Sequence, residues 1–176
     1  LSLGADAMVT SAHKSLPAYS QGALLLARTE RIDPARLDAG VEATATTSPA
    51  GSILASIDAA RALLARDGEA LLGAALAATR AARDELSRID GLVVLDGPAV
   101  DPLKLTLVLS GTGADGNSVE QDLLAAGLPV ESADRDVLVA VVTLADTDRT
   151  VGGLTATLVA SIERHRGAPR GVVAPA

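Results

Sequence analysis

Residues 11–18 have the sequence Ser-Ala-His-Lys-Ser-Leu-Pro-Ala, and this segment gives the clearest indication of the fold. They form a polar turn between two short apolar runs, at residues 7–10 and 22–27. Both runs are too short to be helices, and such runs are typical of strands buried on both faces of an α/β sheet. The loops that follow such strands usually hold the ligands of an α/β protein. The sequence therefore predicts an α/β fold with a ligand site at this turn.

Lys14 is the residue of this turn with the most distinctive chemistry. It is one of only two lysines in a chain that otherwise uses arginine, 13 times, for its positive charge. Arginine keeps its proton in proteins, whereas a lysine amine that loses its proton can form an imine with a carbonyl compound. Ser11 offers a hydroxyl and His13 a ring N–H, and both groups can donate to a phosphate oxygen. The spacing alone leaves open the alternative of a surface turn with a solvated lysine.

The composition indicates a globular chain and argues against several classes of partner. The 176 residues are 48% hydrophobic and carry a net charge of −7, with no cluster of Lys and Arg for nucleic acid or an anionic membrane. No apolar run approaches the roughly 20 residues that span a bilayer. The absence of cysteine argues against disulfides and zinc-type metal sites and suits a reducing cytoplasm. Because the chain begins at Leu1 rather than Met, we expect a fragment of a longer protein.

Two helices are predicted after the second apolar run. Asp33 is a good N-cap in front of a proline, so a helix is expected from there to about Thr44. A second helical pattern opens after residues 46–49 and extends to about residue 89, with a pause at residues 67–68. We expect these helices to connect two domains.

From Asp90 the sequence changes to short β runs separated by Gly, Pro and Asp. The order ββαββα is expected, which describes a small sheet covered on one face by helices. The expected strands are residues 92–95, 104–109, around 130, and 137–143. Two helices are expected: the first is capped by Asn117 or Ser118 and ends at Gly127, and the second spans residues 146–166. Without Phe or Trp, the core must be built from Ala, Leu, Val and Ile. Residues 167–176 are expected to be a loose tail.

Residues 11–18, followed by Gln21-Gly22, are similar to the Ser-x-His-Lys-x-Leu-Pro-Ala stretch of the ornithine/lysine/arginine decarboxylases. That family depends on pyridoxal phosphate (PLP) and has the aspartate aminotransferase fold. Further segments resemble the family in the same order and spacing, so that the resemblance covers about residues 4–165. These segments are residues 33–37, 46–49, 54–61, 101–105, 116–124, 127–131, 142–143 and 146–147.

The resemblance implies an α/β fold made of the end of the PLP-dependent transferase large domain, a three-layer α/β/α structure, and a small α+β domain. The implied divisions are residues 1–58 for the large domain, 59–89 for connecting helices, 90–166 for the small domain and 167–176 for the tail. The implied activity is PLP-dependent decarboxylation of ornithine, lysine or arginine. The implied assembly is a cytoplasmic homodimer or larger homo-oligomer that binds an amino acid substrate.

The resemblance also implies roles for individual residues. Lys14 would bind PLP as a Schiff base and later help to protonate the carbanion left by decarboxylation. Ser11 and His13 would hold the cofactor phosphate, and His13 would be a catalytic residue beside Lys14. Thr46 and Thr47 would approach a phosphate of the partner subunit, because family active sites lie at a dimer interface. The alternative for this loop is structural, with Thr46 or Ser48 as the N-cap of the following helix.

The chain departs from the family in several places. The family usually has an aromatic residue where this chain has Ala50-Gly51-Ser52, which leaves substrate choice open. The acid that pairs with the pyridine nitrogen, the ring that stacks on PLP and the main phosphate loop lie upstream of the lysine in the family, and its C-terminal domain lies downstream. We therefore expect an incomplete decarboxylase. The alternatives are a PLP enzyme of the same fold with another reaction, such as an aminotransferase or oxidase, and a non-catalytic scaffold protein.

Overall fold

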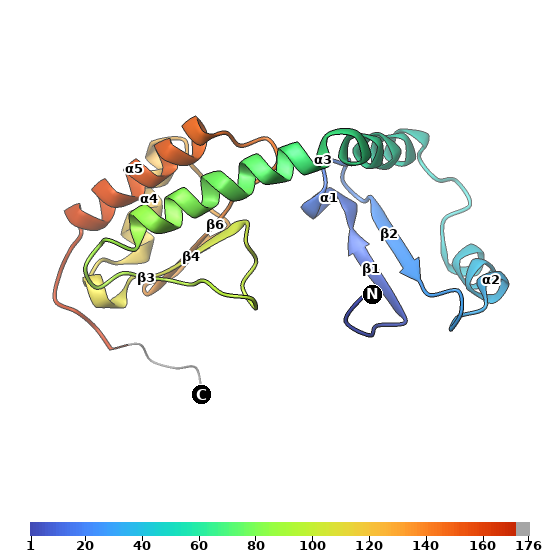
Figure 1. Cartoon of the computed structure of the whole chain (residues 1–176), viewed down its shortest axis with the longest axis horizontal. Coiled ribbons are helices and arrows are strands. Elements are labelled where there is room, and N and C mark those ends of the chain that lie inside the picture. Colours follow the sequence, from blue (N-terminus) through green and yellow to red (C-terminus); the bar gives the residue numbers. More distant parts are fainter. Residues whose placement is uncertain (172–176) are drawn as a thin grey trace. The chain divides into compact units, whose positions relative to one another are not determined.

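The computed structural model describes residues 1–171 and divides into two compact units (Figure 1). Unit 1 is Leu1–Gly68, and unit 2 begins at Glu69. Each unit has its own antiparallel sheet, with two strands in unit 1 and four in unit 2. The mixture of strands and helices agrees with the predicted α/β class.

Unit 1 contains a two-stranded ribbon. β1 (Ala7–Ser11) pairs with β2 (Ala23–Ala27), and α1 (Ala12–Ser15) lies in the connection between them. The strands lie where they were predicted, but the expectation that both faces are buried is wrong in unit 1. Val9 is 73% exposed and Leu26, on the opposite face, is 45% exposed. An apolar run indicates what a strand can bury, whereas burial also requires elements that cover it.

Two helices follow the ribbon. α2 (Pro34–Thr44) begins and ends at the predicted residues, and the Asp33 carboxylate accepts a hydrogen bond from Ala35 N at 2.9 Å. α3 (Gly51–Leu86) is one helix of 36 residues, so the predicted pause at residues 67–68 is wrong. A glycine inside a helix costs about 1 kcal/mol relative to alanine, and the Ala- and Leu-rich turns on both sides outweigh that cost.

Unit 2 has the predicted order ββαββα. Its sheet has the strand order β3-β4-β6-β5. The strands are β3 (Val93–Val94), β4 (Lys104–Val108), β5 (Ser132–Ala133) and β6 (Val137–Val141), and the helices are α4 (Gly116–Ala125), α5 (Asp148–Arg164) and the 3-10 turn η1 (Ser110–Thr112). Asp115, rather than Asn117 or Ser118, caps α4, because its carboxylate accepts a hydrogen bond from Asn117 N at 2.9 Å.

The core of unit 2 lies between one face of its sheet and the helices (Figure 1). Leu105 and Leu107 of β4 alternate with exposed or half-buried residues, as the two-residue period of a strand requires, and are fully buried. Leu138 of β6 joins them, and Leu158 and Ile162 of α5 pack against them. The second half of α3 contributes small side chains to the same cluster. The buried apolar cluster contains only Ala, Leu, Val and Ile, as the composition predicted.

The segment after α5 is bound to unit 2 as far as Arg170. Gly167 N donates to Thr112 O at 3.1 Å, and Arg170 N donates to Ser110 O at 2.8 Å. The Arg170 guanidinium also donates to Ala114 O at 2.7 Å and to the carboxylate of Asp136 at 3.1 Å. The prediction of a loose tail is therefore wrong for residues 167–170, and its part at residues 172–176 lies outside the described residues.

Candidate functional site

Three of the predicted site residues lie together at the end of β1 and the start of α1. Ser11 is the N-cap of α1, and its side chain makes no capping hydrogen bond, so its hydroxyl is free of that role. Ala12 is fully buried and anchors the turn. His13 is half-buried and Lys14 is exposed. The turn therefore fixes its backbone inside unit 1 while it presents the lysine amine to solvent.

The carbonyl oxygen of Gly22 holds this turn in place. It accepts hydrogen bonds from Ala12 N at 2.9 Å, from His13 N at 3.3 Å and from His13 Nδ1 at 2.8 Å. A carbonyl can only accept, so Nδ1 of His13 must carry a proton. The only ring nitrogen left for another partner is Nε2, which in a neutral ring carries no proton.

Gly22 is in turn fixed by the turn that precedes it and by α3. Gly22 N donates to Tyr19 O at 3.1 Å, and Tyr19 N donates to Ser56 Oγ of α3 at 3.0 Å. Gln21 has a φ of 73°, in the left-handed region that costs a non-glycine residue about 1–2 kcal/mol. A Cβ added at Gly22 would lie 3.2 Å from two carbons of the Ile57 side chain. The backbone of this turn is therefore closely restricted.

Thr46 and Thr47 lie in the exposed loop between α2 and α3. Thr46 Oγ1 accepts a hydrogen bond from Ser48 N at 3.2 Å, which closes a local turn. The first turn of α3 bonds instead to Ala50 O, so the alternative that Thr46 or Ser48 caps this helix is wrong. The helix begins at Gly51, two residues later than a Ser48 cap requires.

A hollow of about 610 Å³ lies between this loop and the start of β2. Thr46 and Ser48 line it on one side, Gln21 and Gly22 line it on another, and apolar residues of α3 complete it. The structure thus brings Thr46 beside the segment that holds α1. Within residues 1–171 no hydrogen bond joins Thr46 or Thr47 to Ser11, His13 or Lys14.

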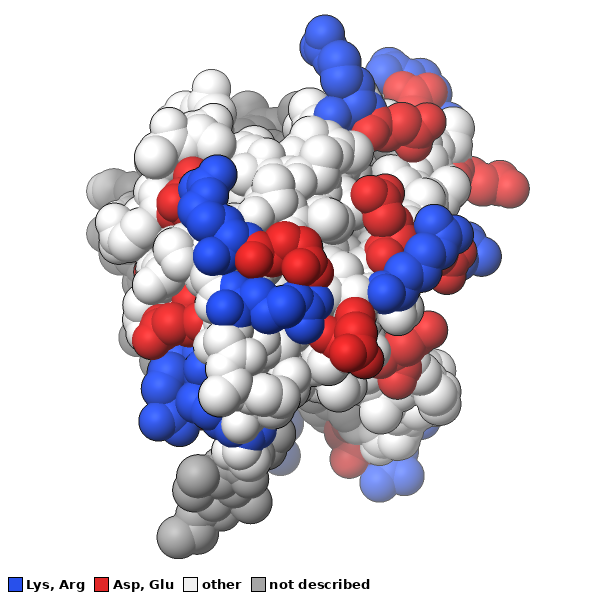
Figure 2. Space-filling view, turned by 90° about the vertical axis from the view of Figure 1, so that its left-hand side faces the viewer, with Lys and Arg blue, Asp and Glu red and all other residues white. Residues whose placement is uncertain are grey.

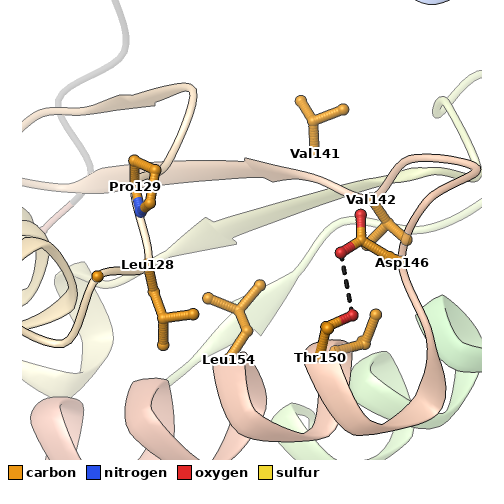
Figure 3. A pocket seen from close by; sticks show the side chains of 9 residues that line it. Leu128, Pro129, Val141, Val142, Asp146, Thr150 and Leu154 are labelled. Atoms are coloured by element: carbon orange, nitrogen blue, oxygen red, sulfur yellow. Dashed lines mark hydrogen bonds between the residues drawn. The ribbon is translucent and has the colours of Figure 1, made fainter. Parts of the chain in front are cut away.

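Unit 2 contains a smaller hollow of about 170 Å³, formed where three of the family-like segments meet (Figure 3). Leu128 and Leu154 lie on one side of it, and Asp146 and Thr150 lie on the other. The Asp146 carboxylate accepts hydrogen bonds from Thr150 Oγ1 at 3.0 Å and from Thr143 N at 2.8 Å. These bonds order the start of α5, so Asp146 has a structural role.

Asp122 is the centre of a polar cluster that joins α4 to α5. Its Oδ2 accepts hydrogen bonds from Ser161 Oγ at 2.7 Å, from Arg164 Nη1 at 2.9 Å and from His165 Nε2 at 3.0 Å. The Ser161 hydroxyl, and then His165 and Arg164, hold the pKa of Asp122 below its usual range because they favour the charged carboxylate. The cluster stabilises the contact between the two helices, and it lies in unit 2, whereas Lys14 lies in unit 1.

Charged side chains of both signs are interspersed on the face drawn in Figure 2. Among the described residues, charged side chains form ion pairs, such as Arg135 with Asp136 at 2.7 Å and Arg61 with Asp58 at 2.8 Å. Among residues 1–171, the ion pairs involve arginine or histidine as the cation, and none includes Lys14. No helix of the described part combines the length and the apolar character needed to span a membrane.

Comparison with known proteins agrees with this geometry. The fold is that of the lysine decarboxylases: the constitutive lysine decarboxylase of E. coli superposes with a TM-score of 0.72 at 21% identity, over 90% of this chain and 28% of that one. Residues 4–98 match the family model described as Orn/Lys/Arg decarboxylase, major domain. The chain belongs to the Orn/Lys/Arg decarboxylase family, which confirms the resemblance and the predicted fold class.

Two curated relatives are arginine decarboxylases. The protein of Halalkalibacterium halodurans is 32% identical over 125 residues, which are 66% of this chain and 26% of the relative. The protein of Bacillus subtilis is 32% identical over 126 residues, which are 67% of this chain and 26% of the relative. The chain therefore spans about a quarter of the length of the curated relatives it matches.

The sequence drew attention to Ser11, His13 and Lys14 but not to the backbone of Gly22. A carbonyl group is common to every residue and has no side-chain signature, so composition and spacing give no direct signal for it. The available signal was indirect. Gln21-Gly22 follows the turn residues Tyr19-Ser20, and a glycine there is typical of a close backbone approach.

Proposed function

We propose that this chain is part of a PLP-dependent decarboxylase of a basic amino acid, with Lys14 as the residue that binds the cofactor covalently. The observation that carries the proposal is the exposed amine of Lys14 on a turn whose backbone is fixed by Gly22. This turn lies inside the segment that matches the family's major domain. Ornithine, lysine and arginine are the candidate substrates.

The donor set of the turn fits a phosphorylated aldehyde cofactor. Lys14 provides a primary amine for the aldehyde, and the Ser11 hydroxyl is free of the capping role. The backbone N–H groups of Ala12 and His13 are already bonded to Gly22 O, so they do not form the phosphate site. Side chains therefore bind the phosphate: Ser11 through its hydroxyl, and His13 through an Nε2–H group when the ring carries both protons, with Thr46 and Thr47 serving a phosphate in the partner subunit.

PLP, when bound, supplies an electron-withdrawing ring that accepts the electron pair released by decarboxylation. Lys14 Nζ holds the cofactor before the substrate arrives. When Nζ is not bonded to the cofactor, it would be free to carry a proton and return it to the substrate carbon. Ser11 and His13 orient the cofactor by its phosphate end. The proposed division of labour is therefore that the cofactor provides the electronic chemistry, and the chain provides position and proton transfer.

The proposal includes a longer polypeptide and a shared active site. The chain spans about a quarter of its curated relatives, and both faces of the β1–β2 ribbon expose apolar side chains that a larger sheet domain would cover. Exposed threonines in the loop at residues 46–47 are suited to reach a neighbouring subunit. The active form is then a cytoplasmic homodimer or larger homo-oligomer.

The test is borohydride reduction of the complete natural polypeptide after incubation with PLP, followed by peptide mapping. We expect a reduced pyridoxyl adduct on Lys14, lost in Lys14→Arg and retained in the matched control Lys104→Arg. Absence of the adduct from a folded, PLP-supplied protein contradicts the proposal and favours a non-catalytic scaffold. With the adduct present, incubation with ornithine, lysine and arginine distinguishes release of carbon dioxide and a diamine or agmatine-type amine from a keto acid product.

A further inference from the structure

We propose that His13 acts on the Lys14 site chiefly as a positioning residue, through the inward hydrogen bond from its Nδ1 to Gly22 O. This inference rests on the proposed function, because the amine to be positioned is the one that binds PLP. The alternative is that the His13 ring acts mainly by contacting the cofactor through Nε2. We call Nδ1, which bonds to Gly22 O, the inward nitrogen and Nε2 the outward nitrogen. The proposal is that the inward nitrogen contributes more to cofactor binding than the outward nitrogen.

The first support is the size of α1. It has four residues, and so short a helix is not stable alone. Its N-cap, Ser11, makes no side-chain capping bond. The His13 ring instead bonds to the same carbonyl that accepts the first two backbone N–H groups of the helix. Gly22 O therefore satisfies the first two N–H groups of the helix, and the ring of His13 adds a third bond that ties the helix to the same carbonyl.

The second support is that the acceptor is itself held. Gly22 is buried, its N–H bonds to Tyr19 O, and its α-carbon faces Ile57 closely enough to leave no room for a methyl group without movement. Tyr19 N is bonded to Ser56 of α3. The bond from the His13 ring to Gly22 therefore ties the ring to the turn at Tyr19 and, through that turn, to α3.

The third support is the position of Lys14, which follows His13 directly and is exposed. The orientation of its side chain depends on the backbone of α1, because the next fixed point is the bond from Leu16 N to Ala12 O. Loss of the His13 bond leaves Ala12 and His13 N–H as the remaining ties to Gly22. The expected result is a more variable direction of the Lys14 amine.

Two substitutions separate the nitrogens of His13. His13→Asn places an amide N–H where Nδ1–H lies and removes the outward nitrogen, whereas His13→Gln places an amide where Nε2 lies and removes the inward bond. Both are polar, and neither places a charge at the site. The pair is therefore a matched comparison of the inward and outward roles.

The measurement is the dissociation constant of PLP and the visible spectrum of the bound cofactor, on the complete natural polypeptide and both variants. Unfolding midpoints are recorded for each protein. We expect His13→Asn to bind PLP within about threefold of the wild type and His13→Gln to bind about tenfold more weakly, the size of one lost hydrogen bond. The Asn variant should also retain the wild-type spectrum.

The other outcomes overturn the inference. They are a greater loss in His13→Asn, equal losses in both variants, no loss in either, and a His13→Gln protein that changes only in unfolding midpoint. A wild-type protein that forms no adduct at Lys14 overturns the proposed function and this inference together. If the wild type forms the adduct and any of these four results is found, the proposed function remains supported, and only the positioning role of the bond from His13 Nδ1 to Gly22 O is contradicted.

Discussion

Replacement of Gly22 by alanine tests whether the turn that holds α1 is as restricted as the contacts indicate. The added Cβ would lie 3.1 Å from Tyr19 O and 3.2 Å from Cδ1 and Cγ1 of Ile57. The Ile57 side chain can move by a few tenths of an ångström, but Tyr19 O belongs to the backbone and already accepts the Gly22 N–H. Overpacking of this degree costs about 1–2 kcal/mol of unfolding free energy.

Equilibrium urea unfolding of the 176-residue chain measures this cost. Tyr19 is the only aromatic residue, so tyrosine fluorescence reports on the turn beside Gly22. Gly40→Ala is the matched control, because Gly40 lies inside α2 and a Cβ there meets nothing within 4 Å. We expect the control to stabilise the chain by up to about 1 kcal/mol, since alanine favours helix over glycine.

A double-mutant cycle with Ile57→Ala identifies the contact responsible. The second substitution removes both side-chain carbons that the new Cβ approaches, so Gly22→Ala should cost at least about 0.5 kcal/mol less in that background. Equal costs in the two backgrounds refute the reasoning about Ile57. A cost below about 0.5 kcal/mol in the wild-type background refutes the view that this turn is tightly packed.

Two further predictions concern unit 2. Arg83 is buried, and its Nη2 donates to Asp101 O at 3.0 Å and to Lys104 O at 2.6 Å. Replacement by methionine, Arg83→Met, should therefore lower the free energy of urea unfolding by about 2–4 kcal/mol. The control Asp96→Asn should lower it by less than about 0.5 kcal/mol, because the Asp96 carboxylate is exposed and lies 3.6 Å from Arg83 Nη1. The pKa of Asp122 is lowered by folding, so its stabilising contribution is present above the unfolded pKa and is lost as pH falls through the folded pKa. The unfolding midpoint of the wild type should therefore fall more steeply below about pH 4 than that of Asp122→Asn, and parallel curves for the two proteins count against this role.

Local signals predicted some elements to the residue. Asp33 is a favourable N-cap, and Pro34 has a backbone φ angle that is already fixed near the helical value; α2 begins at this pair. The order of elements in unit 2 also followed from local periods, because alternation in β4 and glycine at the end of α4 are visible in a few residues. Where the physical cause lies within one turn of chain, sequence reasoning succeeded.

Other features depend on partners distant in sequence. The predicted interruption of α3 treated Gly68 as a stop, although flanking residues decide whether a helix continues. The burial of β1 and β2 depends on which elements cover them, and an apolar run does not contain that information. At the site, Lys14 could be recognised by its chemistry, whereas the bond from His13 to Gly22 O spans nine residues and ends on a carbonyl. Its existence required the three-dimensional arrangement.

The sheet of unit 2 ends on both sides in strands of only two residues, β3 and β5. A free strand edge pairs with another chain through its unpaired N–H and C=O groups, and the attraction grows with the number of such groups in register. With so few groups at either edge, unit 2 offers little on which a foreign strand could extend the sheet. During synthesis and refolding, when many copies are present at high concentration, these short edges should favour separate folded molecules over cross-linked aggregates.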